Sequence, residues 1–456
     1  MQAAQFFDST LLKKYNTHGP RYTSYPTALE FREQFSHENL VQAIVASPNR
    51  ELSLYVHIPF CHSLCYYCGC NKVVTRHRDK ANTYLEFLAQ EIASRAPLFK
   101  DYTVKQLHWG GGTPSFLRHE QISQLVAELK AQFTFAAQVE MSIEIDPREI
   151  EMNLAEHLYS LGFNRLSIGV QDIDDKVQKS INRVQSTEFI EKFIAHAKQV
   201  GFKAINIDLI YGLPHQTIET FTRTLNKAHE MDVERISLFS YAHIPSRFAA
   251  QRKLKDEWLP SADEKFSLMK LAIEKLCNFG YDFIGMDHFA KPEDELSIAQ
   301  KSGDLHRNFQ GYTTKGGCDL LGLGVSSISA IGHSFSQNTK VLQHYYQAIE
   351  TQAHAQVKGV SLSQDDIIRG EVIRELMCNL YIDKNKISQK FAINFDEYFA
   401  EDLPLLQTFI NDGLIKVTLN EIRVEQKARL LIRNICMTFD AYMKQNLNQQ
   451  RFSQVI

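Results

Sequence analysis

Residues 51–70 read ELSLYVHIPFCHSLCYYCGC, and this stretch decides the fold. Its first half is an apolar run with the length and composition of a buried strand. Three cysteines follow at once, Cys61, Cys65 and Cys68, in the spacing Cys-x3-Cys-x2-Cys, with Cys70 two residues further on. A cysteine-rich loop directly after a buried strand indicates a metal centre.

Five further strand-like runs follow, each separated from the next by a stretch long enough for a helix. They are VKQLHWGGG (104–112), VEMSIEID (139–146), RLSIGVQD (165–172), AINIDLIYG (204–212) and RISLFSYAHI (235–244). Between them apolar residues recur at helical spacing, and Gly201 stands where a C-cap glycine would end a helix. This alternation predicts a parallel α/β sheet with right-handed crossovers, either a partial barrel of six strand–helix units or an open wound sheet.

Each run ends in residues that a buried strand does not need. The cysteines follow the first run, and the later ends carry Gly110-Gly111-Gly112-Thr113-Pro114, Glu144 with Asp146, Gln171-Asp172, Asp208 and Tyr241-Ala242-His243. In a parallel barrel the carboxyl ends of the strands share one face, which is where active sites lie. We therefore expect these residues to line one cavity.

The chain of 456 residues has an ordinary composition, 44% hydrophobic and 23% charged, with a net charge of -3. These values indicate a folded protein with no general attraction for nucleic acid or for an anionic membrane. No signal peptide and no run of 18 apolar residues is present, so we expect a cytoplasmic protein that does not insert into membranes. We expect the isolated cysteines to be small buried hydrophobes; they are Cys277, Cys318, Cys378 and Cys436.

The sequence predicts three parts. Residues 1–35 are polar and turn-rich and are expected to form an arm or lid rather than a core element. Residues 36–363 hold the strand–helix units and form the catalytic domain. Residues 364–456 are predicted to be mainly helical with a small β-hairpin, in the order of a winged helix; interleaved acidic and basic residues argue against a nucleic-acid role for them.

Three thiolates at this spacing can reach three corners of a cuboidal iron–sulfur cluster and leave the fourth iron open for a substrate or cofactor. Phe60, Tyr66 and Tyr67 are placed to shield such a cluster from water. The alternative is a structural zinc site. Zinc sites usually draw their ligands from two separated pairs, whereas Cys68-Gly69-Cys70 is too tight to supply two ligands comfortably.

The glycine run at 110–112 lets a ligand approach the backbone closely, because glycine has no Cβ. Beside a cluster loop it indicates a site for the amino group of an amino-acid cofactor. Acceptors and a donor for an amine, a ribose and a carboxylate are then available from Glu144, Gln171, Arg183 and Asp208.

The cysteine loop resembles the signature of the radical S-adenosylmethionine (SAM) superfamily. The motifs PRYTSYPTA, YVHIPFC, CGCN, HWGGGTPS, IEIDPRE, NRLSIGVQD, NIDLIYGLP, IGMDHFA, HRNFQGYTT and LLIRNICM narrow the resemblance to the oxygen-independent coproporphyrinogen III oxidases (dehydrogenases). The resemblance extends over essentially the whole chain. It implies the α/β fold of the radical SAM type, a partial (β/α)6 TIM-like barrel.

In this family the cluster is held by three cysteines, here Cys61, Cys65 and Cys68, and two SAM molecules bind beside it. The resemblance implies that the first SAM chelates the open iron and contacts Tyr55, Gly111, Glu144 and Ile328. It implies that the second contacts Tyr67, Gly112, Thr113, Gln171, Arg183, Asp208 and Ala242. Tyr67 stands where the family often has Phe. The resemblance thus implies a catalytic centre made of the three cluster ligands, Glu144 and Cys70. Cys70 matches the family pattern without being a cluster ligand, and its role stays open.

The implied reaction uses a 5′-deoxyadenosyl radical to remove a hydrogen from a propionate of coproporphyrinogen III. Loss of CO2 and one electron leaves a vinyl group, and a second round gives protoporphyrinogen IX in haem biosynthesis. The implied partners are this substrate, an electron donor and an electron acceptor, and we expect a monomer. Arg21, Tyr22 and Tyr25 are candidates to close over the substrate as a lid that excludes water; the alternative for Arg21 is an ordinary surface guanidinium.

Two other functions remain open from the sequence. Haem-binding chaperones of the same superfamily keep the fold and the cluster, but they typically lack the Cys-Gly-Cys-Asn continuation and the PRYTSYP arm, both of which are present here. A zinc-stabilised binding module is the alternative from a different class.

Overall fold

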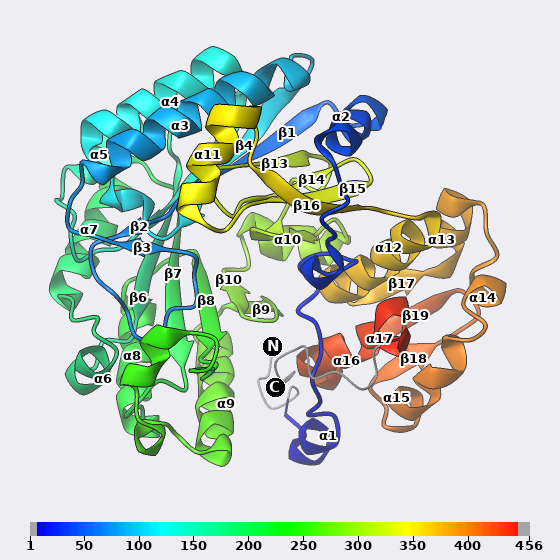
Figure 1. The fold of residues 1–456 in the computed structure, drawn as a ribbon. Coiled ribbons are helices and arrows are strands. Elements are labelled where there is room, and N and C mark those ends of the chain that lie inside the picture. Colours follow the sequence, from blue (N-terminus) through cyan, green and yellow to red (C-terminus); the bar gives the residue numbers. More distant parts are fainter. Residues whose placement is uncertain (1–6, 446–456) are drawn as a thin grey trace. The chain divides into compact units, whose positions relative to one another are not determined.

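The structure is a computed structural model that describes residues 7–445 (Figure 1). Residues 1–6 of the predicted arm and 446–456 of the predicted C-terminal domain lie outside the described residues. The chain forms two compact units. Unit 1 joins the residues up to Glu30 with Ile273–Gly316 and the residues from Leu362 onward, and unit 2 joins Phe31–Ala272 with Gly317–Ser361.

Unit 2 is built on six neighbouring parallel strands, and all six predicted runs form them. In sheet order they are β1 (Glu51–Ile58), β4 (Thr103–Gly111), β5 (Thr134–Ile145), β6 (Arg165–Gln171), β7 (Ala204–Tyr211) and β8 (Arg235–Ser240). Every neighbouring pair is parallel. The predicted partial (β/α)6 barrel is confirmed, and its strands carry their carboxyl ends to one edge.

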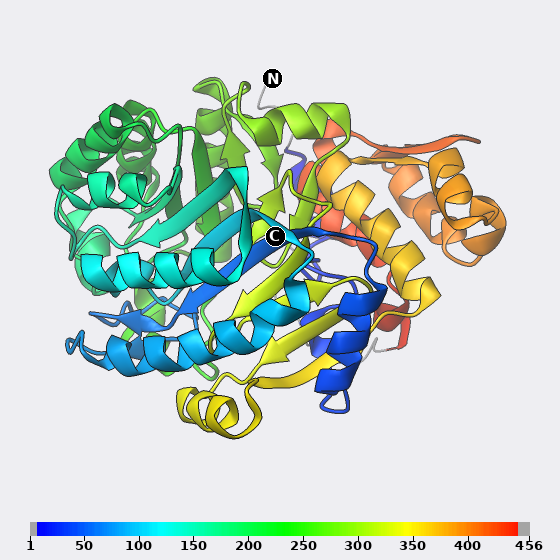
Figure 2. The same ribbon diagram turned by 90° about the horizontal axis from the view of Figure 1, so that it is seen from above.

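Helices that connect these strands, or follow the last of them, form an outer layer around the sheet (Figures 1 and 2). They are α3 (Lys80–Arg95), α4 (His119–Gln132), α5 (Leu154–Ser160), α6 (Asp175–Ser180), α7 (Thr187–Val200), α8 (Ile218–Glu230) and α9 (Ala262–Asn278). Helix α7 shows why the sequence folds this way: Ser186 caps its first turn, and Gly201 ends it with a φ of 126°, as predicted.

Four strands that the sequence did not reveal extend the sheet beyond β1. Strand β13 (Asp319–Leu323) pairs in parallel with β1, and three antiparallel strands follow, β14 (Ile328–Ile331), β15 (Ser334–Asn338) and β16 (Gln356–Ser361). The buried Glu91 of α3 fixes this extension, because it accepts hydrogen bonds from Gly324 N, Asn338 Nδ2 and the Tyr345 hydroxyl. Helices α2 (His37–Ala46) and α11 (Leu342–Gln352) complete unit 2.

The C-terminal part of unit 1 has the predicted winged-helix order. Its elements are α12 (Gln364–Asn379), β17 (Tyr381–Asp383), α13 (Lys384–Phe391), α14 (Phe395–Tyr398), α15 (Gln407–Asn411), β18 (Ile415–Val417), β19 (Glu421–Val424), α16 (Ile432–Met437) and α17 (Ala441–Gln445). The hairpin β18–β19 pairs with β17 in a three-stranded antiparallel sheet. Unit 1 also holds α1 (Ser9–Lys14), the hairpin β9 (Asp282–Gly285)–β10 (His288–Ala290), α10 (Glu295–Ser302) and the hairpin β11 (His306–Asn308)–β12 (Gly311–Thr313).

Within the arm, residues 7–30 belong to unit 1 and residues 31–35 to unit 2. Several of its side chains are buried, so the expectation that the arm forms no part of a core was wrong. Tyr22 and Tyr25 are buried, and the Tyr22 hydroxyl donates to Asp440 at 2.9 Å. The Arg433 guanidinium donates to the carbonyls of Gly19 and Pro20. The division into parts 1–35, 36–363 and 364–456 stays a prediction.

Cys277, Cys378 and Cys436 are buried, as predicted, while Cys318 is half-buried. Between residues 7 and 445, none of the helices combines the length and the apolar composition that a membrane span requires.

Candidate active site

The cysteine loop, residues 61–70, follows β1, and the segments before and after the loop are hydrogen-bonded to each other. It begins in the short strand β2 (Phe60–Cys61), which pairs with β3 (Val73–Val74) just beyond the loop. Val73 N donates to Pro59 O at 2.7 Å, and Thr75 N donates to Cys61 O at 2.9 Å. The three thiols are therefore carried on a loop whose entrance and exit are held together.

Hydrogen bonds from distant residues hold the middle of the loop. Asn182 Nδ2 donates to Leu64 O at 2.8 Å, and Tyr66 N donates to the carbonyl of Ile181 at 3.0 Å. The buried Gln251 amide donates to both Tyr67 O and Ala242 O at 3.1 Å, which brings Ala242, after β8, beside the loop.

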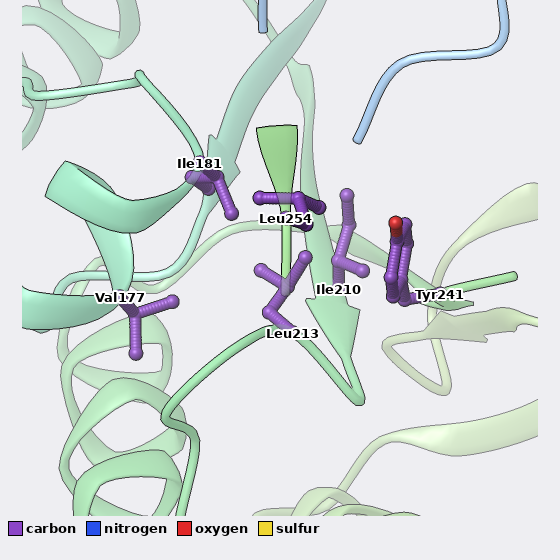
Figure 3. Packing of buried hydrophobic residues seen from close by; sticks show 6 residues of the cluster. All are labelled: Val177, Ile181, Ile210, Leu213, Tyr241 and Leu254. Atoms are coloured by element: carbon purple, nitrogen blue, oxygen red, sulfur yellow. The ribbon is translucent and has the colours of Figure 1, made fainter. Parts of the chain in front are cut away.

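An apolar cluster at the ends of β7 and β8 supports the aromatic part of the loop (Figure 3). Tyr66 and Tyr67 pack against it, as do Phe239 and Leu259. Its buried members, labelled in Figure 3, are Val177, Ile181, Ile210, Leu213, Tyr241 and Leu254. The packing removes part of these two tyrosine side chains from water, on one side of the loop.

Each of the three thiols faces at least one hydrogen-bond donor. The Thr113 hydroxyl donates to Cys61 Sγ at 3.4 Å, and Cys70 N donates to Cys68 Sγ at 3.4 Å. A hydrogen bond from the Cys70 side chain is the main cause that lowers the pKa of Cys68 to about 6. Donors favour the thiolate, which is the form that binds metal. Cys70 thus contacts a predicted ligand.

All eight cysteines are free, and Cys61 and Cys65 are buried. No three or more His, Cys, Asp or Glu side chains of residues 7–445 are grouped to hold a single metal ion. An iron–sulfur cluster takes its thiolates at separate corners, so its ligands stand further apart than those of one ion. Three donor-facing thiols on one loop fit that group.

The glycine run at the end of β4, Gly110 to Gly112, carries no side chains because none would fit there. A Cβ on Gly111 would lie 2.6 Å from the His57 ring, and the φ of Gly111 is 116°. A Cβ on Gly112 would lie 2.5 Å from Pro59 O. Gly111 N donates to Glu144 Oε2 at 3.2 Å, which aims the carboxylate at this backbone. The run can thus hold a ligand closely against main chain.

Of the four residues predicted for the first SAM, Gly111 and Glu144 lie at the carboxyl ends of β4 and β5. Tyr55 lies within β1, and Ile328 is the first residue of β14. Tyr55 pairs in register with Gly322, and a Cβ on Gly322 would lie 2.5 Å from Ile328 O. The Tyr55 hydroxyl lies 3.2 Å from His57 Nδ1, and the ring's Nε2 lies 3.2 Å from Asn71 O. The structure brings Tyr55 and Ile328 together through β13.

The residues predicted for the second SAM include a buried guanidinium. Arg183 Nη2 donates to Gly169 O at 2.7 Å, and a Cβ on Gly169 would lie 2.8 Å from both Arg183 Nη2 and Gln171 Nε2. Gln171 has a φ of 65°. Within the part of the chain that the structure describes, the buried Nε of Arg183 has no hydrogen-bond partner, so a polar ligand can still use it.

Asp208 of β7 accepts a hydrogen bond from Asn206 Nδ2 at 2.9 Å. Burial, and next the charge of Glu144, raise the pKa of the Asp208 carboxyl to about 7. The carboxyl therefore changes its charge close to neutral pH, where a cationic ligand would favour the ionised form.

Sequence reasoning missed several residues that build this site. His57 lies within an apolar run, which gave no sign of its role. Asn182 stands in a turn and Gln251 in a short 3-10 helix, Ala249–Lys253, both far from the cysteines in sequence. Arg148 carried a signal, since it follows the strand-end Asp146 by two residues, but its contact with Cys65 was not foreseen.

The comparisons with known proteins agree with this geometry. Residues 55–228 match the family model of the radical SAM superfamily, and residues 362–431 match that of the HemN C-terminal domain. The oxygen-independent coproporphyrinogen III oxidase of Salmonella typhimurium is 55% identical over 450 residues, 99% of this chain and 98% of that protein. The Escherichia coli protein of that name is 54% identical, also over 99% of this chain and 98% of its own length.

A solved structure has the same fold. Coproporphyrinogen III oxidase (HemN) from Escherichia coli, described as a radical SAM enzyme, superposes with a TM-score of 0.93 at 54% identity, over 96% of this chain and all of that one. The fold and the site thus define a radical SAM enzyme, with a [4Fe-4S] cluster and SAM as its cofactors. More narrowly, the chain belongs to the family of oxygen-independent coproporphyrinogen III oxidases.

Proposed function

We propose that this chain converts coproporphyrinogen III to protoporphyrinogen IX in haem biosynthesis, by oxidative decarboxylation of two propionate side chains to vinyl groups. Each conversion removes one hydrogen atom, one CO2 and one electron from a propionate. The observation that carries the proposal is the match over 99% of the chain, at 55% identity, to a coproporphyrinogen III oxidase. Family models match in both the catalytic part and the C-terminal part.

The bound cluster and SAM would supply the radical that removes the hydrogen atom. The chain's own residues would hold the cluster, orient SAM and exclude water. Cys61, Cys65 and Cys68 would hold the cluster, and the bare backbone at Gly111 with Glu144 would orient the SAM amine. Tyr66 and Tyr67, packed on the apolar cluster, would exclude water from one side.

The alternatives are not supported. The two relatives described above, from Salmonella typhimurium and Escherichia coli, match over nearly the whole chain and are named as oxygen-independent coproporphyrinogen III oxidases, which favours neither a haem chaperone nor a zinc-stabilised module.

The direct test is anaerobic turnover. Protein reconstituted with iron and sulfide, and supplied with dithionite, SAM, an electron acceptor and coproporphyrinogen III, is expected to form protoporphyrinogen IX, measured by chromatography after oxidation to the porphyrin. Cys65→Ala should abolish the product, whereas Cys277→Ala, which removes a buried cysteine outside the site, should retain it. Wild-type protein that carries an intact cluster yet makes no vinyl product would contradict the proposal.

We propose further that two SAM molecules bind at once. The support is that the site offers two groups of polar side chains, one around Tyr55 and Glu144 and the other around Arg183, Gln171 and Asp208. Equilibrium dialysis of the reconstituted protein should give two molecules per chain, and Asp208→Asn should reduce this to one.

The pKa of Asp208 adds a pH dependence to this prediction. With the pKa at about 7, the carboxyl is mostly neutral at lower pH and ionised above it, so wild-type affinity for the second, cationic SAM should rise as pH increases through 7. The Asp208→Asn protein should show no such rise. One molecule per wild-type chain at saturation would refute the two-SAM proposal.

We also propose that the arm 1–35 covers the bound substrate. Its support is Arg21, which pairs with Asp287 but keeps 42% of its side chain exposed, so its guanidinium is accessible to a carboxylate. Deleting the arm would be a poor test, because Arg433 and Asp440 would lose their partners.

Arg21→Gln is the sharper variant. Losing one charge-assisted hydrogen bond should raise KM for coproporphyrinogen III roughly tenfold or more, with kcat changed much less. Lys13→Gln, an exposed neighbour in α1, is the matched control and should leave KM unchanged. Steady-state kinetics measure this difference in KM, and an Arg21→Gln enzyme with the wild-type KM would contradict the proposal.

We propose, finally, a monomer in the cytoplasm that draws on a separate electron donor and electron acceptor. Eight free cysteines support a reducing compartment.

A further inference from the structure

Three charged side chains gather at the Cys65 thiol in unit 2. Arg148 Nη2 donates to Cys65 Sγ at 3.4 Å, and Arg183 Nη1 donates to the same sulfur at 3.5 Å. Asp146 lies between the two guanidiniums, accepting from Arg148 Nη2 at 2.6 Å and from Arg183 Nη1 at 3.1 Å. Two cations and one anion leave this group with a net positive charge.

The group is well shielded and its charges are fixed. The side chains of Arg148, Arg183 and Asp146 are 11%, 6% and 13% exposed. Asp146 forms ion pairs with both arginines, at 2.6 Å with Arg148 and at 3.1 Å with Arg183. Because each buried charge is paired with an opposite one, all three side chains are ionised.

The other two thiols have different surroundings. Cys61 accepts from the Thr113 hydroxyl, and Cys68 from the backbone of Cys70. Among the three predicted ligands, as residues 7–445 describe them, Cys65 is the thiol that accepts hydrogen bonds from guanidinium groups.

We propose that Arg148, together with Arg183 and opposed by Asp146, raises the reduction potential of the cluster by acting on the Cys65 corner. Reduction adds an electron to a group that already carries thiolate charge. Hydrogen bonds to a ligand sulfur and nearby positive charge stabilise that added charge, so they make reduction easier. The low exposure of the three side chains keeps water and salt from screening the effect.

The inference rests on the proposed function, because it takes Cys65 as a cluster ligand. Arg148 is then a positioning residue that acts through Cys65. Its effect has a sign that packing alone would not produce, since Arg148 and Asp146 should move the potential in opposite directions.

The test is a redox titration of reconstituted protein without SAM, followed by electron paramagnetic resonance of the reduced cluster. In Arg148→Met the equilibrium constant for reduction should fall roughly tenfold, a shift of 59 mV to more negative potential for one electron. Asp146→Asn should shift the potential in the positive direction. Arg148→Lys, which keeps the charge, should stay near the wild type.

Arg118→Met is the matched control, because it removes a cation that is exposed and pairs with Asp79 outside the site; its potential should equal that of the wild type. An Arg148→Met cluster with the wild-type potential would overturn the proposal, as would shifts of both variants in the same direction.

Should Arg148→Met take up no iron, Asp146→Asn decides. A positive shift supports the proposal, and an unchanged or more negative potential overturns it. Failure of the proposed function looks different, since the wild type itself would then take up no cluster or form no vinyl product.

Discussion

The closure of the cysteine loop onto the end of β1 is the constraint on which the site depends. Three thiolates can share one cluster only if they are held close together in space. Here one loop carries all three, and it is fixed where it begins and ends by the hydrogen bonds of Val73 and Thr75. Its middle is held from afar by Asn182 and Gln251. The parallel sheet supplies those distant anchors, because its strand ends and the loops after them converge at one edge.

Two kinds of surface lie around that loop: the main chain of the glycine run, and the charged side chain of Arg183. Gly111 and Gly112 lie so close to His57 and Pro59 that no side chain fits, which leaves main chain for the ligand. On the other side, Arg183 is buried against the carbonyl of Gly169. The glycine main chain suits close contact with a ligand. The guanidinium of Arg183 suits recognition of polar groups on a ligand, and it adds positive charge beside the Cys65 sulfur.

Much of the fold could be predicted from the sequence, because continuous apolar runs that end in polar residues mark parallel buried strands. Strands β13–β16 escaped prediction: their stretch is rich in glycine and serine, and β13 pairs with β1 across a long separation in sequence. The burial of Tyr22 was hidden for the same reason, since its partner Asp440 lies 418 residues away. The cysteines and glycines of the site could be predicted from their spacing in the sequence. Gln251 contacts the cysteine loop at the carbonyl of Tyr67, and no local sequence pattern indicates that contact.

With three thiols as its ligands, the cluster keeps one iron open for SAM. Mössbauer spectroscopy tests it most directly, on protein reconstituted with the Mössbauer-active isotope of iron. Adding SAM is expected to change the isomer shift of one iron in four and to leave the other three unchanged. A spectrum that SAM does not alter would rule out an open iron that binds SAM, as would four irons that respond alike.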